Sequence, residues 1–165
     1  MFKKKNRNNI SKIIENNLDY LVRFAYFRLG ERSEAEDVVY DAILKFLERN
    51  PNEIKPESIR LYLFRIVHNL CLDRLRYGKR ELVLDDNINI EETPDDLYDL
   101  EEIERINDFL ISLPQRESDV IRMRIVDNLS FVEISKILSI PQSTSKSRYK
   151  SGMEKLRRMV IKNKL

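Results

Sequence analysis

The sequence predicts an all-α fold of two small helical domains, an N-terminal helical bundle and a C-terminal helix-turn-helix, joined by an acidic linker. Apolar residues recur at three- and four-residue steps along most of the chain, and its 165 residues include only three glycines and no tryptophan. Residues 81–104 hold eleven acidic and no basic side chains, whereas residues 1–80 and 105–165 carry net charges of +6 and +7. Two cationic domains indicate a polyanionic partner, because cationic surfaces attract polyanions.

Three helices are expected in the first domain. Apolar residues from Ile10 to Leu29 follow a helical period, and Gly30 stands where a C-cap is expected. Ser33 and Glu36 match a capping box, which predicts that the second helix begins there. Its expected inward residues are Val38, Val39, Ala42, Ile43, Phe46 and Leu47. Its other face carries Glu36, Asp37, Tyr40 and Asp41.

A loop over residues 50–56 precedes the third helix, expected from about Glu57 to Tyr77 and ended by Gly78. From Arg60 to Arg80, six basic side chains against the single Asp73 make this helix and the residues just after it strongly cationic. The basic residues are Arg60, Arg65, Arg74, Arg76, Lys79 and Arg80. Aromatic residues at helical spacing are more often core than base-stacking, so Tyr62 and Phe64 are expected mainly in the core.

The acidic linker has too few large apolar residues to bury a core of its own. Thr93 and Pro94 match an N-cap followed by proline in the first helical turn. We therefore expect a helix after them that joins the second domain.

The last third of the chain predicts a helix-turn-helix. Leu113 and Pro114 open one helix, and a capping box from Ser130 to Glu133 opens the next, which ends at Ser139-Ile140-Pro141. The helix after this turn is rich in small polar and basic residues, as a reader of the DNA major groove needs. The candidates for groove and phosphate contact are Thr144, Lys146, Ser147, Arg148 and Lys150.

Several classes of protein do not fit the sequence. No apolar run approaches the roughly 18 residues of a membrane span, and no signal-peptide pattern is present. Cys71 is the only cysteine, so no internal disulfide forms, which fits a reducing cytoplasm. The only histidine, His68, has too few neighbouring ligands for a metal site and is expected to be either structural or adjacent to a phosphate. No catalytic constellation or cofactor motif appears, so the sequence predicts no enzyme and no cofactor.

Three stretches resemble one known family, the sigma factors of the housekeeping-type superfamily, and specifically the small two-domain extracytoplasmic-function (ECF) group. SEAEDVVYDAILKFLE (Ser33–Glu48) resembles the segment that grips the clamp helices of the RNA polymerase β′ subunit. LYLFRIVHNLCLDRLR (Leu61–Arg76) resembles the helix that opens and reads the promoter minus-10 element. LSFVEISKILSIPQSTSKSRYKSGMEKLRR (Leu129–Arg158) resembles the minus-35 reader. The stretches follow the family's order and separation.

This resemblance implies a factor that binds core RNA polymerase, at the β′ clamp helices and the β flap, and directs promoter-specific initiation. It assigns residues 1–80 to polymerase binding and the minus-10 element, 81–104 to the linker and the start of the joining helix, and 105–165 to the minus-35 element. The implied polymerase contacts are Glu36, Asp37, Tyr40 and Asp41. The implied minus-10 contacts are Arg65, Asn69, Arg74, Arg76 and Arg80. An anti-sigma protein, which the family commonly uses, is a further implied partner.

The chain departs from the family pattern at three places. Tyr40 stands where glutamine is usual. Ser143-Thr144-Ser145 replaces Gly-Thr-Val before the Lys-Ser-Arg of the recognition helix, so Ser145 takes the place of a buried apolar residue. Ser139 occupies a turn position often held by glycine. None of these changes removes a basic DNA contact.

Two alternatives remain open from the residues. The linker either keeps two cationic domains apart by charge repulsion or passes through the RNA path of polymerase, as the resemblance implies. The other function considered is a stand-alone helix-turn-helix regulator that binds operator DNA as a dimer. Such a regulator has no need for an acidic docking helix followed by a cationic one, which occupy Ser33–Arg80.

Overall fold

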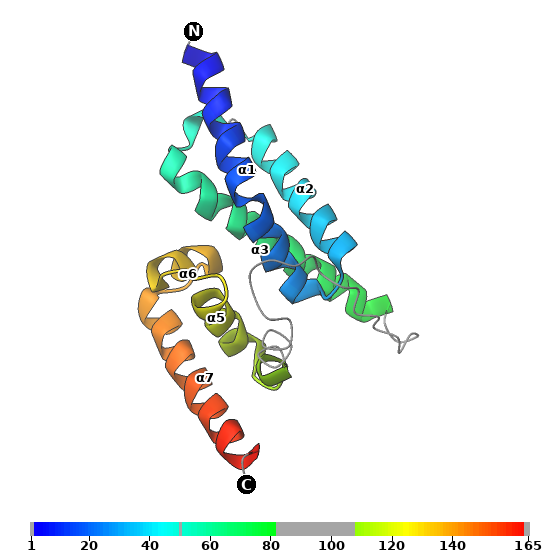
Figure 1. The fold of residues 1–165 in the computed structure, drawn as a ribbon, viewed down its shortest axis with the longest axis vertical. Coiled ribbons are helices and arrows are strands. Elements are labelled where there is room, and N and C mark those ends of the chain that lie inside the picture. The colour runs from blue at the N-terminus through cyan, green and yellow to red at the C-terminus, as the bar shows by residue number, and fades with distance from the viewer. Residues whose placement is uncertain (1, 50, 82–107, 164–165) are drawn as a thin grey trace. The chain divides into compact units, whose positions relative to one another are not determined.

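A computed structural model describes residues 2–49, 51–81 and 108–163 (Figure 1). Its elements are α1 (Phe2–Leu29), α2 (Arg32–Glu48), the short 3-10 helix η1 (Pro51–Glu53), α3 (Pro56–Glu81), α5 (Gln115–Ile125), α6 (Phe131–Leu138) and α7 (Gln142–Asn163). Residues 108–111 are also helical. Every regular element in these ranges is a helix, so the all-α prediction is confirmed. The chain forms two compact units, the first with α1 to α3 and the second with α5 to α7.

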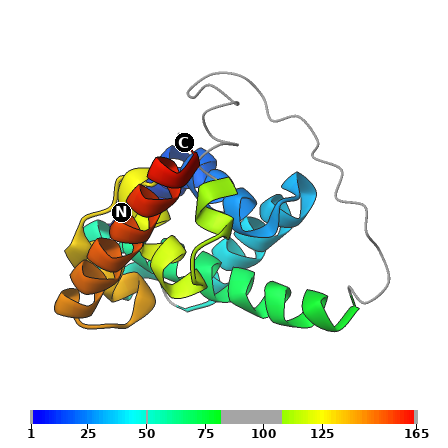
Figure 2. The ribbon, with the colours of Figure 1, turned by 90° about the horizontal axis from the view of Figure 1, so that it is seen from below.

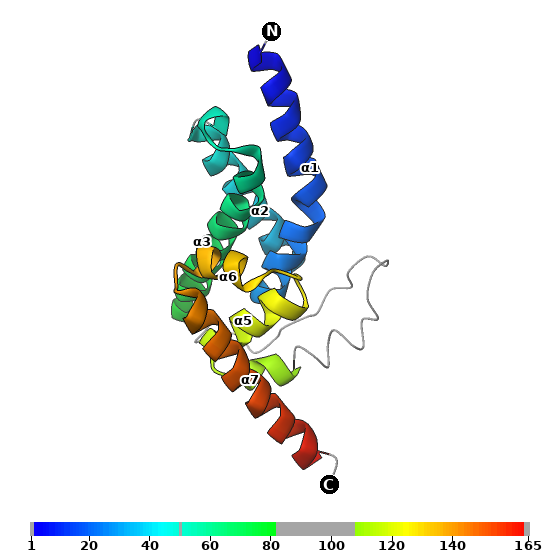
Figure 3. The same cartoon turned by 90° about the vertical axis from the view of Figure 1, so that its left-hand side faces the viewer.

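The first unit is a three-helix bundle in which each helix packs against the other two. After a short turn at Gly30, α2 runs back beside α1, and α3 packs against both (Figures 1 and 3). The Phe24 and Phe64 rings meet edge to face at the centre, with centroids 5.0 Å apart. Phe64 is therefore a core residue. Other buried side chains are Leu21, Val38, Val39, Ala42, Phe46, Ile59, Leu63 and Val67.

The turn between α1 and α2 corrects one expected helix start. Gly30 has a positive φ of 77°, and its N–H donates to the Tyr26 carbonyl at 2.8 Å, as expected of a C-cap. Because α1 ends there, the next extended residue is Glu31, and Glu31 rather than Ser33 is the N-cap of α2. The predicted capping box is wrong: the Ser33 hydroxyl donates to the Glu31 carboxylate at 2.6 Å.

The predicted end of α3 is also wrong. The helix continues through Gly78 to Glu81, and Gly78 has no positive φ. Glycine inside a helix costs only about 0.5–1 kcal/mol relative to alanine, so neighbouring turns can carry the helix past it. The linker and the expected N-cap at Thr93 and Pro94 lie outside the described residues.

The second unit is a helix-turn-helix supported by α5. The capping box at α6 is confirmed: Ser130 Oγ accepts from the Glu133 N–H at 3.2 Å, and the Glu133 carboxylate accepts from the Ser130 N–H at 2.7 Å. Ser139 ends α6 with a φ of 54°, in the left-handed region. At the start of α5, Pro114 is the N-cap rather than the first helical residue.

The α5 and α7 helices lie side by side and approach closely (Figure 2). Gly152 of α7 faces α5, where a Cβ atom would lie 2.5 Å from Ile121 Cδ1 and 3.2 Å from Glu117 Cβ. The Glu117 carboxylate accepts hydrogen bonds from Ser151 Oγ and Lys155 Nζ, each at 2.8 Å. The bond from Lys155, joined by the bond from Ser151, lowers the pKa of Glu117 despite partial burial. This contact fixes the rotation of α7 about its own axis.

We expect Gly152→Ala to destabilise the second unit. The added methyl group overlaps the buried Ile121 side chain, and overpacking costs about 1–3 kcal/mol, more than the roughly 0.5–1 kcal/mol that alanine gains in a helix. Urea unfolding followed by circular dichroism would measure the loss. Gly78→Ala is the matched control, since a Cβ there meets nothing within 4 Å; it should stabilise the first unit. Equal effects of the two changes would contradict the packing argument.

Candidate nucleic-acid and protein interfaces

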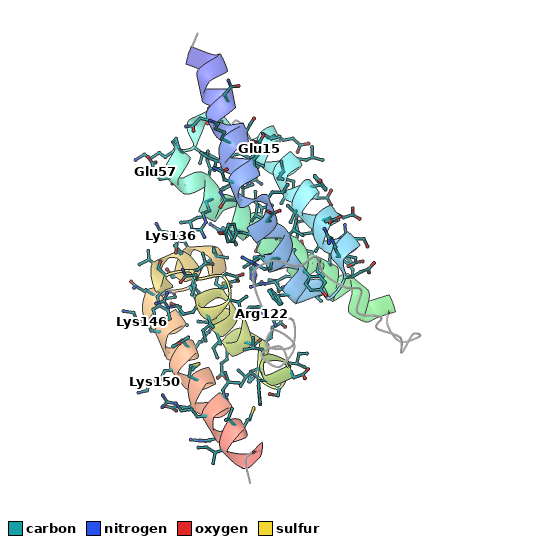
Figure 4. The ribbon with its side chains drawn as sticks, viewed as in Figure 1. Glu15, Glu57, Arg122, Lys136, Lys146 and Lys150 are labelled. Atoms are coloured by element: carbon teal, nitrogen blue, oxygen red, sulfur yellow. The ribbon has the colours of Figure 1, made fainter. Side chains whose placement is uncertain are left out.

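The first half of α7 presents a basic surface. Lys146, Ser147 and Lys150 are exposed, whereas Thr144 and Arg148 are half-buried. In Figure 4, Lys146 and Lys150 extend from α7 away from α5, and Lys136 extends from α6 on the same side. We refer to Lys136, Lys146 and Lys150 as the cationic face. Lys136 is not among the predicted contacts, because nothing in the α6 sequence alone relates it to the α7 surface.

The contacts behind this face hold α7 against α6. Ser145 is fully buried, and its hydroxyl donates to the Gln142 carbonyl at 2.8 Å. The Phe131 and Tyr149 rings pack edge to face with centroids 5.4 Å apart. Arg124 lies over Phe131 and donates to the Leu129 carbonyl at 3.1 Å. A buried serine with a satisfied hydroxyl thus occupies the position where the family pattern has an apolar residue.

The rotation of α7 separates the five predicted minus-35 contacts into two groups. Ser151 and Lys155 are tied to α5, and at 100° per residue Thr144 and Arg148 fall toward that same side. Ser147 is exposed, but its hydroxyl donates to the Thr144 carbonyl at 3.0 Å. Lys146 and Lys150 are therefore the predicted contacts with the most open position.

Three of the predicted minus-10 contacts share one face of α3. Arg65, Asn69 and Arg76 are exposed and fall within an arc of about 40° at 100° per residue. Arg76 lies 3.9 Å from Asp73, a weak surface ion pair. The side chain of Arg80 lies outside the described residues.

Arg74 lies on the opposite side of α3 from these residues. It pairs with Asp41 of α2, with Arg74 Nη2 3.5 Å from Asp41 Oδ2. The structure thus joins a residue expected at DNA with a residue expected at polymerase. Sequence reasoning missed this because a helix 26 residues long presents cations on all sides.

The outer face of α2 combines carboxylates with exposed apolar side chains. Asp37 and Asp41 are exposed, and Glu36 pairs with Arg32 at 2.8 Å. Tyr40, Leu44 and Leu47 are 59%, 59% and 46% exposed and recur at helical spacing; we call them the α2 stripe. Leu47 was expected inside, which is wrong: Phe46 takes the core position, so the next residue turns about 100° away.

His68 is buried on the inner face of α3. It is 4% exposed, and its ring lies 6.5 Å from that of Phe24. Its Nδ1 atom makes no hydrogen bond within the described part of the chain. Burial, and then the nearby positive charge of Arg28, lower the pKa of His68 from 6.5 to about 4. The histidine is neutral in the folded protein near pH 7.

The described ranges contain neither a metal-binding cluster nor a membrane-spanning helix. No group of three or more His, Cys, Asp or Glu side chains is placed there to hold a metal ion. None of the described helices is long and apolar enough to span a bilayer.

Comparisons with known proteins match both units. Residues 13–81 match the model for sigma-70 region 2, and residues 109–158 match the model for sigma-70 region 4. The chain belongs to the sigma-70 family, in its ECF group. The ECF RNA polymerase sigma factor SigW of Bacillus subtilis is 28% identical over 96% of this chain and 92% of its own length. The RNA polymerase sigma factor SigV of the same organism is 27% identical over 87% of this chain and 86% of its own length.

Two solved structures share the fold. One is the sigma factor RpoE of Bartonella quintana in complex with the anti-sigma factor NepR, with a TM-score of 0.72 and 21% identity over 91% of this chain and 95% of that chain. The other is CnrH in complex with the cytosolic domain of CnrY, with a TM-score of 0.67 and 18% identity; the match covers 92% of this chain and 86% of that chain. As an ECF sigma factor, the protein directs promoter-specific transcription initiation. The stand-alone regulator is not favoured, since region 2 covers α1 to α3.

Acid should destabilise the region 2 unit through His68. The unfolded chain binds a proton below pH 6.5, whereas folded His68 stays neutral down to about pH 4. The free energy of unfolding should therefore fall as the pH drops from 6.5 to 4, by up to about 3 kcal/mol. Urea unfolding of the parent and of His68→Gln across this range would measure the difference. A parallel pH dependence of the two proteins would contradict it.

Proposed function

We propose that this sigma factor docks on core RNA polymerase through α2, contacts the minus-10 element through α3, and reads the minus-35 element through α7. We assign these roles to residues 1–80 and 105–165, with 81–104 as the linker between them. The proposed partners are the β′ clamp helices and β flap of core polymerase, and promoter DNA. The protein acts in the cytoplasm as a specificity subunit and catalyses no reaction itself.

The composition of the α2 outer face carries the docking assignment. The α2 stripe exposes two leucines and a tyrosine beside the carboxylates of Asp37 and Asp41. Exposed apolar side chains rimmed by charge are typical of a protein-binding surface. The stripe supplies apolar area for affinity, whereas the carboxylates set the register on a basic helix. Leu44 and Leu47 extend the predicted contact surface beyond Glu36, Asp37, Tyr40 and Asp41.

The α3 face suits a separating DNA strand. Arg65 and Arg76 can bind phosphates. Asn69, which lies between them along the helix, can form a hydrogen bond with the edge of an unstacked base. Binding energy of this kind offsets the cost of unpairing without ATP. Arg74 approaches DNA from a different side, after exchanging Asp41 for a phosphate, and Arg80 follows at the end of the helix.

Neither unit alone needs to bind a promoter tightly. Once both are mounted on one polymerase, the second contact becomes intramolecular, and effective concentration raises the joint affinity. An anti-sigma protein is a further proposed partner, since the RpoE structure of the same fold was determined with the anti-sigma factor NepR bound. Run-off transcription with core polymerase and genomic DNA tests the proposal: the purified chain should enable initiation at discrete start sites. Protection of an operator by the chain alone, without initiation, would refute it.

The docking assignment predicts that Asp41→Arg strongly weakens association with core polymerase. A like charge opposite a basic helix should weaken binding on the order of 10- to 100-fold. A pull-down with core enzyme measures this, and Leu44→Ser tests the α2 stripe without changing charge. Glu15→Arg is the matched control, an exposed carboxylate on α1 (Figure 4). Unchanged binding of Asp41→Arg would place docking elsewhere.

Charge removal on the cationic face should weaken promoter binding without altering sequence preference. For Lys146→Ala we expect the salt dependence of holoenzyme binding to a minus-35 promoter to decrease by about one unit of slope. Arg148→Ala, nearer to α5, should have a smaller effect unless its guanidinium reaches a base. Lys162→Ala, an exposed lysine near the end of the same helix, is the control. A minus-35 footprint unaffected by Lys146→Ala argues against α7 as the reader.

A further inference from the structure

We propose that Gln142 reads an adenine in the minus-35 element, an inference that rests on the proposed DNA-binding role of the C-terminal unit. Gln142 is the first residue of α7, and its side chain is exposed. The N-terminal residues of a recognition helix are the ones that reach base edges in the major groove. Gln142 therefore occupies a base-reading position, although the sequence patterns singled out only residues from Thr144 onward.

Gln142 lies in register with the cationic face. Gln142, Lys146 and Lys150 follow one another at four-residue steps, so they fall within an arc of about 80° on α7. Both lysines are exposed and extend away from α5 (Figure 4). When these lysines bind phosphates, Gln142 at the N-terminal end of the helix points into the major groove. Affinity and base reading are thus supplied by neighbouring turns of one helix.

Ser145 holds the backbone that carries Gln142. The Gln142 carbonyl accepts a hydrogen bond from the buried Ser145 hydroxyl at 2.8 Å, and the Ser145 N–H donates to the Pro141 carbonyl at 3.2 Å. The same hydroxyl lies 3.5 Å from the Phe131 carbonyl of α6, so the buried Ser145 connects the first turn of α7 to α6. A base-reading group needs such support, since a small displacement would break its hydrogen bonds.

The chemistry of the side chain selects the base. Five exposed side chains lie in the first half of α7: Gln142, Ser143, Lys146, Ser147 and Lys150. Among these five, only Gln142 places a donor and an acceptor in one planar group. Adenine presents the matching pair in the major groove, the N6 amino donor beside the N7 acceptor, whereas guanine presents two acceptors. The amide therefore favours an A·T pair, and the lysines alone would favour guanine or phosphate.

A single-atom change in the DNA tests this inference. Holoenzyme made with the full chain is bound to promoters in which each adenine of the minus-35 region is replaced in turn by 7-deazaadenine, which lacks the N7 acceptor. At one adenine the parent should lose on the order of 10-fold in affinity. Gln142→Ala should bind the unmodified promoter as weakly as the parent binds that modified one, with no further loss on modification. Gln115→Ala, an exposed glutamine at the first position of α5, is the matched control.

The outcomes separate two kinds of failure. Three results would overturn the adenine assignment while leaving DNA binding by α7 intact. Gln142→Ala could weaken binding equally at every promoter sequence, or it could bind like the parent. Alternatively, no adenine of the minus-35 region could be sensitive to the modification. A parent holoenzyme with no minus-35 footprint at all would instead overturn the proposed function, and this inference with it.

Discussion

The rotation of α7 about its axis is the constraint on which the proposed DNA-reading surface depends. Gly152 lets α7 approach α5, and Glu117 binds Ser151 and Lys155 on the same side. These contacts turn Lys146 and Lys150 outward and leave Arg148 at the flank. A side chain in place of the glycine would push the helices apart and change which residues reach a groove. The proposed DNA-reading surface is therefore specified by residues on the opposite side of α7 from Lys146 and Lys150.

The region 2 unit meets a different constraint, since its helices serve both the core and the surface. On α2 the buried Phe46 and the exposed Leu47 are neighbours, and on α3 the buried Phe64 precedes the exposed Arg65. A helical period of 3.6 residues makes this possible, because adjacent residues point about 100° apart. The proposed docking and DNA-contact surfaces of this protein can therefore change without altering the core that carries them.

Much of this arrangement could be predicted from sequence, and the failures have local physical causes. The capping box at Ser130 was predicted correctly because a free turn precedes it, whereas the pattern at Ser33 failed because Gly30 had already ended α1 three residues earlier. The glycine at position 30 ends a helix but the one at 78 does not, since only the first has a positive φ. Periodicity placed the core, but the pairing of Arg74 with Asp41 depends on how two helices pack, which no single helix encodes.

The division between charged and neutral side chains explains how a strongly basic helix can still be selective. Lysines bind phosphate regardless of sequence, so adding them raises affinity for every site equally. Selectivity comes from side chains that meet a base edge in a fixed direction, and such side chains require a rigid backbone. The buried hydroxyl of Ser145, hydrogen-bonded within the first turn of α7, provides such rigidity where an apolar side chain would supply only packing. The departure from the family pattern at this position thus adds a directional restraint at the end of the helix that we propose reads bases.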